Sequence, residues 1–425
     1  MKERKRSKEL YDRAKILMPG GVSSPVRAFK PYPSYIAKGS GAKVWDVDGN
    51  EYIDYCMGFG PLILGHADPD VVNAVREQAP RGMLYGAPIA LEIEMAELIR
   101  GAFPSVEMLR IVNTGTEATM HAIRVARGFT GRKKFIKIEG AFHGAHDSVL
   151  VKAGSGATTH SSPDSLGVPE EVTSNTLLVP FNDLEAVRTA IMENKGEVAA
   201  IIIEPVIGNA GPIPPEEGYL QGLREATTEN DILLILDEVI TGFRLALGGA
   251  QQRFGVRADM TILGKVVGGG LPIGIFGGSE EIMSMVSPTG KVYQAGTFSG
   301  NPMSLTAGIA TIKKMRTLGY EELERKGEQM RYGLMKVIEE MGLPFRAQGV
   351  GSMFQLFLTD GEVKNYAGAR SCDTSAFREL LLGLMNRGIY LPPSQFETNF
   401  ISTAHTDAEI DLTVEAYGEA LEDAL

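Results

Sequence analysis

The sequence predicts an α/β protein with a large domain built on a mainly parallel β-sheet and a smaller α+β domain at the C-terminal end. Short β-rich runs recur through the middle of the chain and alternate with segments of helical period, a pattern typical of parallel strands covered by helices on both faces. From about Met303 the pattern changes to a long charged helix followed by a strand pair. The 425 residues are enough for two or three packed units with ample core.

We expect an N-terminal segment over residues 1–65, a large domain over 66–302 and a small domain over 303–425. In the N-terminal segment, two apolar-alternating runs between Ala42 and Tyr55 flank Asp48-Gly49, a turn pair that favours a hairpin. Amphipathic stretches at 70–77 and 91–103 predict two helices. The basic start of the chain is typical of a solvated helix.

The large domain begins with MLRIVNTGTEATMHAIRVAR, which predicts a strand, a glycine-containing loop and a helix. Further strands are expected at KFIKI, SVLVKA, TLLVPF, VAAIIIEPV, ILLILDEVI and MTILGK. Helices are expected at 184–193 and 219–228. In the small domain, LPFRAQGVGSMFQLFLTD predicts the strand pair and residues 375–387 predict a helix.

Composition excludes several classes of protein. Lys plus Arg total 42 against 53 Asp plus Glu, a formal charge of −11, so the protein as a whole does not attract nucleic acid or anionic membrane. The two cysteines, Cys56 and Cys372, have neither C-x-x-C spacing nor histidine partners, which argues against a disulfide scaffold and against a zinc site, and we expect no metal in the site. We expect no signal peptide and no membrane span, and therefore a cytoplasmic enzyme with a local basic site for any anionic substrate.

Lys265 is the first candidate catalytic residue. It follows an apolar strand and precedes three consecutive glycines in TILGKVVGGGLPIG. A lysine amine becomes nucleophilic when apolar surroundings lower its pKa, and glycines let a cofactor lie close to the backbone, so a Schiff-base lysine is one interpretation. A surface lysine beside a flexible loop is the other.

Asp237 closes the buried run ILLILDEVI, at the strand end where open α/β sheets place their ligands. A carboxylate there can keep a pyridine nitrogen protonated and so make the ring an electron sink. Val239 projects from the same strand face and could pack against that ring. A helix cap or a structural salt bridge is the alternative for Asp237.

Thr114, Gly115 and Thr116 lie in NTGTE, between an apolar strand and a helix. Backbone N–H groups and hydroxyls at a helix N-terminus form a cradle for phosphate. A plain N-cap is the competing interpretation.

In this order, the three features resemble the fold-type I pyridoxal-phosphate enzymes and, among them, the class III aminotransferases. The matching motifs are DEV, GKVVGGGLPIG and NTGTEA. The resemblance implies a large domain with a mainly parallel sheet of the seven-stranded kind, and pyridoxal 5′-phosphate or pyridoxamine 5′-phosphate as the cofactor. In GTFSGNP it implies that Thr297 reaches the phosphate of a neighbouring subunit, and hence a homodimer with shared active sites.

Within that group, essentially the whole chain resembles the glutamate-1-semialdehyde aminomutases. The segments that carry this resemblance are MPGGVSSPVRAF, VKAGSGATTHSSPDSLGVP, EPVIGN, KVYQAGTFSGNP and PPSQFE. It implies that Ser24 and Arg27 bind the substrate carboxylate, for which a forked guanidinium is suited. It also implies an acid at the substrate end, Glu397, for which a capping role is the alternative.

The same resemblance implies that Glu204, Asn209 and His143 lie near the cofactor. A buried, hydrogen-bonded histidine is the alternative for His143. Two positions depart from the family pattern. Phe142 stands where a tyrosine usually stacks on the ring, which keeps the stacking but loses the hydroxyl, and Thr114 replaces a serine, which keeps the hydroxyl.

The implied reaction is the isomerisation of glutamate-1-semialdehyde to 5-aminolevulinate in porphyrin biosynthesis, through 4,5-diaminovalerate and without an external amino donor. Val151 to Pro169, rich in Gly, Ser and Thr, is expected to act as a lid that retains the diamine, or else to be a plain solvent loop. Contact with glutamyl-tRNA reductase is a further implication. An ω-amino acid transaminase or an amino-acid racemase on the same scaffold is the main alternative. A non-catalytic, DNA-binding regulator is disfavoured because no helix-turn-helix extension is present.

Overall fold

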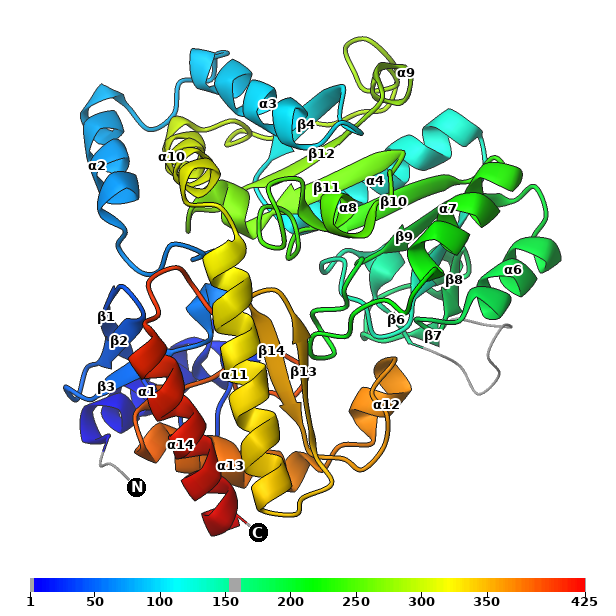
Figure 1. The fold of residues 1–425 in the computed structure, drawn as a ribbon. Coiled ribbons are helices and arrows are strands. Elements are labelled where there is room, and N and C mark those ends of the chain that lie inside the picture. Colours follow the sequence, from blue (N-terminus) through cyan, green and yellow to red (C-terminus); the bar gives the residue numbers. More distant parts are fainter. Residues whose placement is uncertain (1–3, 153–161, 425) are drawn as a thin grey trace.

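The computed structural model describes residues 4–152 and 162–424, and its centre is a seven-stranded sheet (Figure 1). The strand order is β4-β12-β11-β10-β9-β5-β8. The strands are β4 (Met108–Val112), β12 (Gly274–Gly278), β11 (Met260–Gly264), β10 (Leu233–Glu238), β9 (Val198–Ile203), β5 (Lys134–Ile138) and β8 (Thr176–Val179). Only β12 runs antiparallel to its neighbours in this sheet, so the predicted mainly parallel sheet is confirmed.

Helices cover both faces of this sheet because successive side chains of the central strands point to opposite sides. In β9, Ile201 and Ile203 join the core beneath α6 (Leu184–Glu193) and α7 (Tyr219–Glu229). Ala200 and Ile202 join the core beneath α4 (Gly115–Thr130). Continuous apolar strands are therefore required here, as the runs VAAIII and LLIL indicate.

The carboxyl ends of β4, β10 and β11 lie at one edge of the sheet and position the candidate site. The loop after β4 leads directly into α4, whose N-cap is Thr114. Lys265 follows β11 immediately and adopts φ +48°, a left-handed backbone conformation that is uncommon for a residue with a side chain. Such strained positions persist only when their surroundings hold them, as they often do in functional sites.

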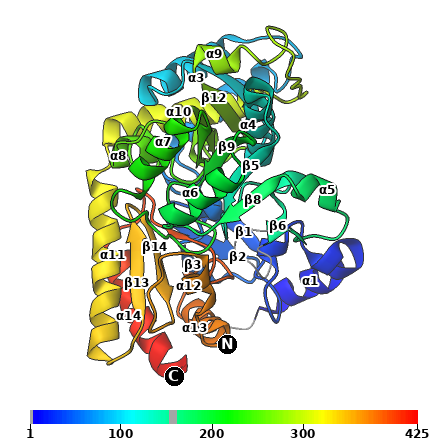
Figure 2. The same ribbon diagram turned by 90° about the vertical axis from the view of Figure 1, so that its right-hand side faces the viewer.

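Two small sheets lie beside the large one (Figures 1 and 2). The first joins β1 (Ile36–Ser40), β2 (Lys43–Asp46) and β3 (Glu51–Asp54) to the C-terminal strand β15 (Ile389–Tyr390). The hairpin predicted around Asp48-Gly49 is therefore confirmed as β2–β3. The second consists of β13 (Arg346–Val350), β14 (Met353–Phe357) and β16 (Asn399–Phe400), which confirms the predicted strand pair.

The helices expected at 70–77, 91–103, 184–193, 219–228 and 375–387 are confirmed as α2 (Pro69–Gln78), α3 (Ala90–Ala102), α6, α7 and α13 (Thr374–Asn386). The long charged segment after 303 forms two helices, α10 (Pro302–Leu318) and α11 (Glu321–Glu340). The basic start forms α1 (Lys5–Leu17). The remaining α-helices are α5 (Glu170–Thr173), α8 (Gly249–Phe254), α9 (Glu280–Met283), α12 (Tyr366–Arg370) and α14 (Asp407–Ala424).

In the large sheet, one strand prediction was wrong and one strand was not predicted. SVLVKA does not enter the large sheet: it forms a 3₁₀ turn and the two-residue strand β6 (Val151–Lys152), which pairs with β7 (Ser162–Pro163). The glycine-rich β12 lies inside the large sheet, between β4 and β11. The predicted lid spans this region, and residues 153–161 of it lie outside the described residues.

Within the described ranges, none of the helices is both long and apolar enough to cross a membrane. The same part of the chain contains no cluster of His, Cys, Asp and Glu side chains that could hold a metal ion. Cys56 and Cys372 are both buried, and both are free thiols that form no disulfide.

Candidate active site

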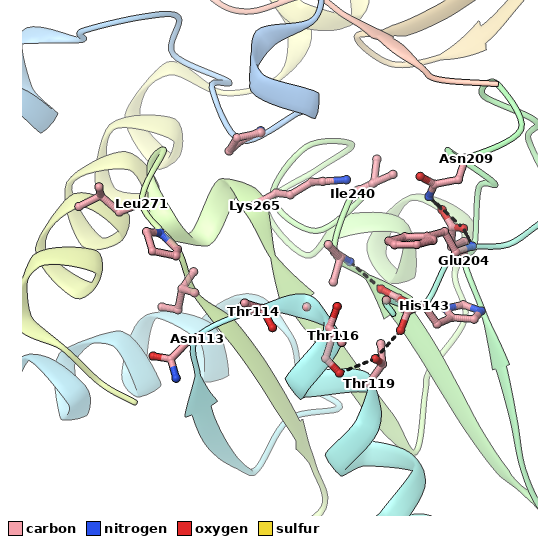
Figure 3. Close-up of a pocket in the computed structure, with 18 of the residues that line it drawn as sticks. Asn113, Thr114, Thr116, Thr119, His143, Glu204, Asn209, Ile240, Lys265 and Leu271 are labelled. Atoms are coloured by element: carbon pink, nitrogen blue, oxygen red, sulfur yellow. Dashed lines mark hydrogen bonds and ion pairs between the residues drawn. The ribbon is translucent and has the colours of Figure 1, made fainter. Parts of the chain in front are cut away.

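The carboxyl edge of the large sheet opens into a cavity of about 450 Å³ (Figure 3). Most of the residues predicted to bind a cofactor meet there, although they come from segments far apart in the sequence. They are Thr114, Gly115, Thr116, Phe142, His143, Glu204, Asn209, Asp237, Val239 and Lys265.

One end of the cavity is the N-terminus of α4. The Thr114 hydroxyl accepts a hydrogen bond from the backbone N–H of Glu117 at 3.1 Å. A Cβ at Gly115 would lie 3.2 Å from Val239 Cγ2, so glycine lets the loop approach that side chain closely. Free backbone N–H groups and the dipole of a 16-residue helix favour an anion here.

Lys265 extends into the cavity toward the side where Glu204 and Asn209 lie (Figure 3). Burial lowers the pKa of its amine, whereas the nearby carboxylates of Glu204, Glu397 and Asp237 act in the opposite direction. Burial has the larger effect, so the pKa of the amine is lower than that of an ordinary lysine, which shifts the equilibrium toward the neutral, nucleophilic form.

Asp237 and His143 form a buried pair on the cavity wall. His143 Nδ1 lies 2.7 Å from Asp237 Oδ2, and the side chains are 0% and 3% exposed. Asp237 Oδ1 also accepts the backbone N–H of Val239 at 3.1 Å. The Thr119 hydroxyl donates to the His143 carbonyl at 2.6 Å, so the carboxylate is held in one orientation at the cavity.

Glu204 connects two loops of the cavity wall. Its carboxylate accepts the backbone N–H of Phe142 at 2.8 Å, the backbone N–H of Gly208 at 3.0 Å and the Asn209 amide at 3.1 Å. Burial raises the pKa of this carboxyl. Phe142 itself is 56% exposed and projects from the loop that Glu204 holds, so its ring is free to cover a ligand.

A second cavity of about 530 Å³ adjoins the first and shares Phe142, His143 and Asn209 with it. Glu397 lines this second cavity, and burial raises the pKa of its carboxyl. Lys137 also lines it, and burial lowers the pKa of that amine to about 8. The two cavities therefore meet at the wall formed by Phe142, His143 and Asn209.

Three of the predicted site residues lie outside both cavities. Ser24 precedes the 3₁₀ turn of residues 25–27, and its carbonyl accepts the N–H of Arg27 at 3.0 Å. Arg27 is exposed and lines a separate cavity, although the preceding residue, Val26, lines the second cavity beside Glu397. Thr297 has an exposed side chain.

Sequence reasoning missed several residues of the site. Thr119 lies one helical turn after Thr116, and this spacing could have placed it on the same side of α4. Gly144 was not considered, yet a Cβ there would lie 2.5 Å from the Thr116 hydroxyl. Lys137 gave no signal because its run KFIKI reads as an ordinary strand.

The arrangement fits a flat heteroaromatic ring that carries a phosphate. The N-terminus of α4 can hold the phosphate, and Asp237 can pair with a protonated ring nitrogen. Val239 provides an apolar surface and Lys265 an amine. His143 Nε2 is buried and has no hydrogen-bond partner within residues 4–152 and 162–424, which leaves a polar atom for a ligand.

Comparison with known proteins supports this interpretation. Residues 26–417 match the family Aminotransferase class-III. The chain is 58% identical to the glutamate-1-semialdehyde 2,1-aminomutase of Archaeoglobus fulgidus over 98% of this chain and 99% of the relative. It is 56% identical to the enzyme of that name from Methanococcoides burtonii, over 97% and 98%.

Two solved structures have the same fold over nearly the full length. An omega-transaminase from Sphaerobacter thermophilus superposes with a TM-score of 0.93 at 35% identity, covering 98% of this chain and 97% of the transaminase. A glutamate-1-semialdehyde aminomutase from Pseudomonas aeruginosa, solved in complex with PMP, superposes with a TM-score of 0.89 at 27% identity, covering 99% and 95%.

The fold and the cavity at the carboxyl edge of its sheet are those of a fold-type I pyridoxal-phosphate enzyme. The chain belongs to the class-III aminotransferase family. Its similarity to curated aminomutases extends over almost the entire sequence.

Proposed function

We propose that this protein is a glutamate-1-semialdehyde 2,1-aminomutase that uses pyridoxal and pyridoxamine phosphate and supplies 5-aminolevulinate for porphyrin biosynthesis. The observation that carries the proposal is the cavity of Lys265 and Asp237 in a chain that is 51–58% identical to aminomutases along nearly its whole length. The resemblance that the sequence motifs carry implied the same reaction.

The cofactor would be held by residues that already converge in the cavity. Thr114, Gly115 and Thr116 would hold the phosphate and Asp237 the ring nitrogen, while Val239 and Phe142 would flank the ring. Glu204, Asn209 and His143 would surround its edge. When bound, the cofactor withdraws electrons from the carbon that carries the substrate amine and so makes its protons acidic.

Lys265 would move these protons. In its neutral form the amine can remove a proton from one carbon and return it to another, provided that it stays within hydrogen-bond reach of both. The lowered pKa increases the neutral fraction at physiological pH. Its side chain, which extends from the end of a rigid strand, keeps the amine inside the cavity.

Substrate recognition would come from the second cavity. Glu397 lies there, close enough to Lys265 to affect the pKa of its amine. The loop that contains Ser24 and Arg27 passes the same cavity at Val26. A guanidinium on this loop would provide the local positive charge that an anionic substrate needs in a protein of net charge −11.

An ω-amino acid transaminase is the second candidate. It is favoured by the 35% identity to the Sphaerobacter omega-transaminase, which exceeds the 26–27% identity to the solved aminomutase. Labelling separates the two. With unlabelled glutamate-1-semialdehyde and [¹⁵N]alanine, an aminomutase forms unlabelled 5-aminolevulinate, because the amino group comes from the substrate skeleton. Transfer of ¹⁵N from alanine to the aldehyde carbon, with labelled 4,5-diaminovalerate and pyruvate as the products, would favour the transaminase.

We further propose a cytoplasmic homodimer in which Thr297 of each subunit completes the phosphate site of its partner. Thr297 is exposed, and the neighbouring Phe298 and Tyr293 are 57% and 70% exposed. Large apolar side chains exposed together in this way support an interface with the partner subunit at this segment. Contact with glutamyl-tRNA reductase, which would deliver the reactive aldehyde directly, is part of the same proposal. Sedimentation of the enzyme alone and with the reductase tests both associations.

A further inference from the structure

Arg244 is a fully buried arginine that connects three parts of the molecule. It lies in the turn after β10 and is 1% exposed. Its guanidinium donates to the Gly60 carbonyl at 2.5 Å, to the Ser352 hydroxyl at 2.9 Å and to the Ile401 carbonyl at 3.3 Å. Gly60 lies after β3, near the N-terminus. Ser352 lies in the turn between β13 and β14, and Ile401 directly follows β16.

None of these three acceptors carries a charge. In the described part of the chain, the only charged or titratable group that raises the pKa of Arg244 is the Tyr320 hydroxyl. Burial lowers the pKa of Arg244 to about 9, so the group remains a cation at neutral pH. A buried charge without a carboxylate partner destabilises a fold, which indicates that this cation serves a purpose other than stability.

Arg244 lies directly behind the wall that contacts the Lys265 side chain. Its guanidinium carbon is 4.7 Å from the centre of the Phe400 ring. Gly60 lies between that ring and the lysine: a Cβ at Gly60 would be 3.1 Å from Phe400 Cζ and 3.4 Å from Lys265 Cδ. The same guanidinium therefore holds Gly60 by its carbonyl and Phe400 by its ring face.

We propose that Arg244 is a positioning residue for Lys265: its guanidinium holds the Gly60–Phe400 wall against the lysine methylenes and places an uncompensated positive charge behind the amine. The proposal deepens the proposed function, because it rests on Lys265 being the catalytic amine. It does not depend on which substrate the enzyme takes.

The charged groups around Lys265 explain why such a cation is useful. Glu204, Asp237 and Glu397 face the lysine from three different segments, and each favours its ammonium form. Asp237 is paired with His143. Arg244 is the cation that acts against them, since its charge favours the neutral amine, in the same direction as burial.

The test measures the Lys265 amine directly. In enzyme loaded with pyridoxamine phosphate the cofactor carries its own amine, so Lys265 is free and can be acetylated by trace acetic anhydride. The labelled fraction of its peptide is measured by mass spectrometry between pH 6 and 11. In Arg244→Gln, which keeps N–H donors for the two carbonyls, the labelling midpoint should rise by about one pH unit, the effect of a unit charge at an effective dielectric constant of about 20.

Arg331→Gln is the matched control. Arg331 is also largely buried and donates to the Gly351 carbonyl at 2.7 Å, beside Ser352, but it is not among the groups that affect Lys265. Its midpoint should equal that of the wild type. An unchanged midpoint in folded Arg244→Gln, checked by circular dichroism, would overturn the proposal.

Arg244→Lys provides the test if the glutamine variant does not fold. Lysine keeps the charge but cannot reach Gly60 and Ser352 together with one planar group. The midpoint should then stay near that of the wild type, while the limiting labelling rate at high pH rises because the wall loosens. A limiting rate equal to that of the wild type would overturn the proposal. Labelling needs no turnover, so failure of the proposed reaction and failure of this inference give different results.

Discussion

Replacing Gly144 by alanine should weaken cofactor binding although none of the residues assigned to hold the cofactor is itself replaced. Gly144 adopts φ +94°, and a Cβ there would lie 2.5 Å from the Thr116 hydroxyl and 2.6 Å from Thr116 Cα. Both distances are below 3.0 Å, and Cβ atoms in real structures essentially never approach another heavy atom that closely. Since one of the contacts is to the backbone, Thr116 cannot escape by rotating its side chain and must move with the start of α4.

The size of the effect follows from the interaction that is disturbed. A hydrogen bond to a charged group contributes about 1.5–3 kcal/mol, so losing the one from Thr116 to phosphate should raise the dissociation constant of pyridoxal phosphate about 10- to 150-fold. The left-handed conformation that alanine must adopt at position 144 destabilises the folded protein by about 1–2 kcal/mol. This loss of stability does not by itself change the affinity for the cofactor.

Titration of the cofactor-free enzyme with pyridoxal phosphate, followed by absorbance, measures this constant. Gly49→Ala is the matched control, because Gly49 has a similar φ of +88° but a Cβ there meets nothing within 4 Å. Gly49→Ala should lose only the stability that the left-handed backbone costs and Gly144→Ala at least as much in thermal unfolding, and only Gly144→Ala should bind the cofactor more weakly. Equal dissociation constants in both would refute the assignment of Thr116 to the phosphate cradle.

Three further substitutions test other parts of the site. Lys265→Ala should still fold and bind the cofactor through Asp237 and the α4 loop, but should lose a factor of about 10³ or more in turnover; near-normal formation of 5-aminolevulinate would contradict the role of this amine. Arg27→Ala should raise KM for the semialdehyde about 10-fold or more, since a charged carboxylate loses a forked partner, and an unchanged KM would place the carboxylate elsewhere. Thr297→Ala should weaken cofactor binding in the dimer, and wild-type enzyme that stays fully active as a monomer at high dilution would count against a shared site.

The large sheet could be predicted from the sequence wherever a strand is apolar on both faces. The runs VAAIII and LLILDE are typical of buried strands, because helices cover both faces of the sheet and every side chain of these strands is buried. The strand GIFGG was missed because glycine-rich segments usually mark loops. Its glycines are required by packing: a Cβ at Gly274 would overlap the Thr114 carbonyl, and one at Gly278 would lie 2.5 Å from the Asp259 carbonyl.

Residues at strand ends could be assigned to the site, whereas pairings over long distances in the sequence could not. Asp237, Lys265 and Thr114 each lie at the carboxyl end of a predicted strand, and parallel strands bring these ends to one edge. The Asp237–His143 pair joins residues 94 positions apart, and no local pattern encodes it. Arg244 interacts with Gly60 and Ile401, 184 and 157 positions away, so its place behind Lys265 is visible only in three dimensions.

The number of product molecules formed per active site, in the absence of any amino donor, tests the central claim most directly. The enzyme is loaded with pyridoxamine phosphate, freed of excess cofactor and incubated with glutamate-1-semialdehyde alone, with Lys265→Ala as the inactive control. An aminomutase regenerates the amine form of its cofactor in each cycle, so we expect many molecules of 5-aminolevulinate per site. Formation of no more than one amine product per site, with turnover resuming only after an amino acid is added, would contradict the account and identify a transaminase.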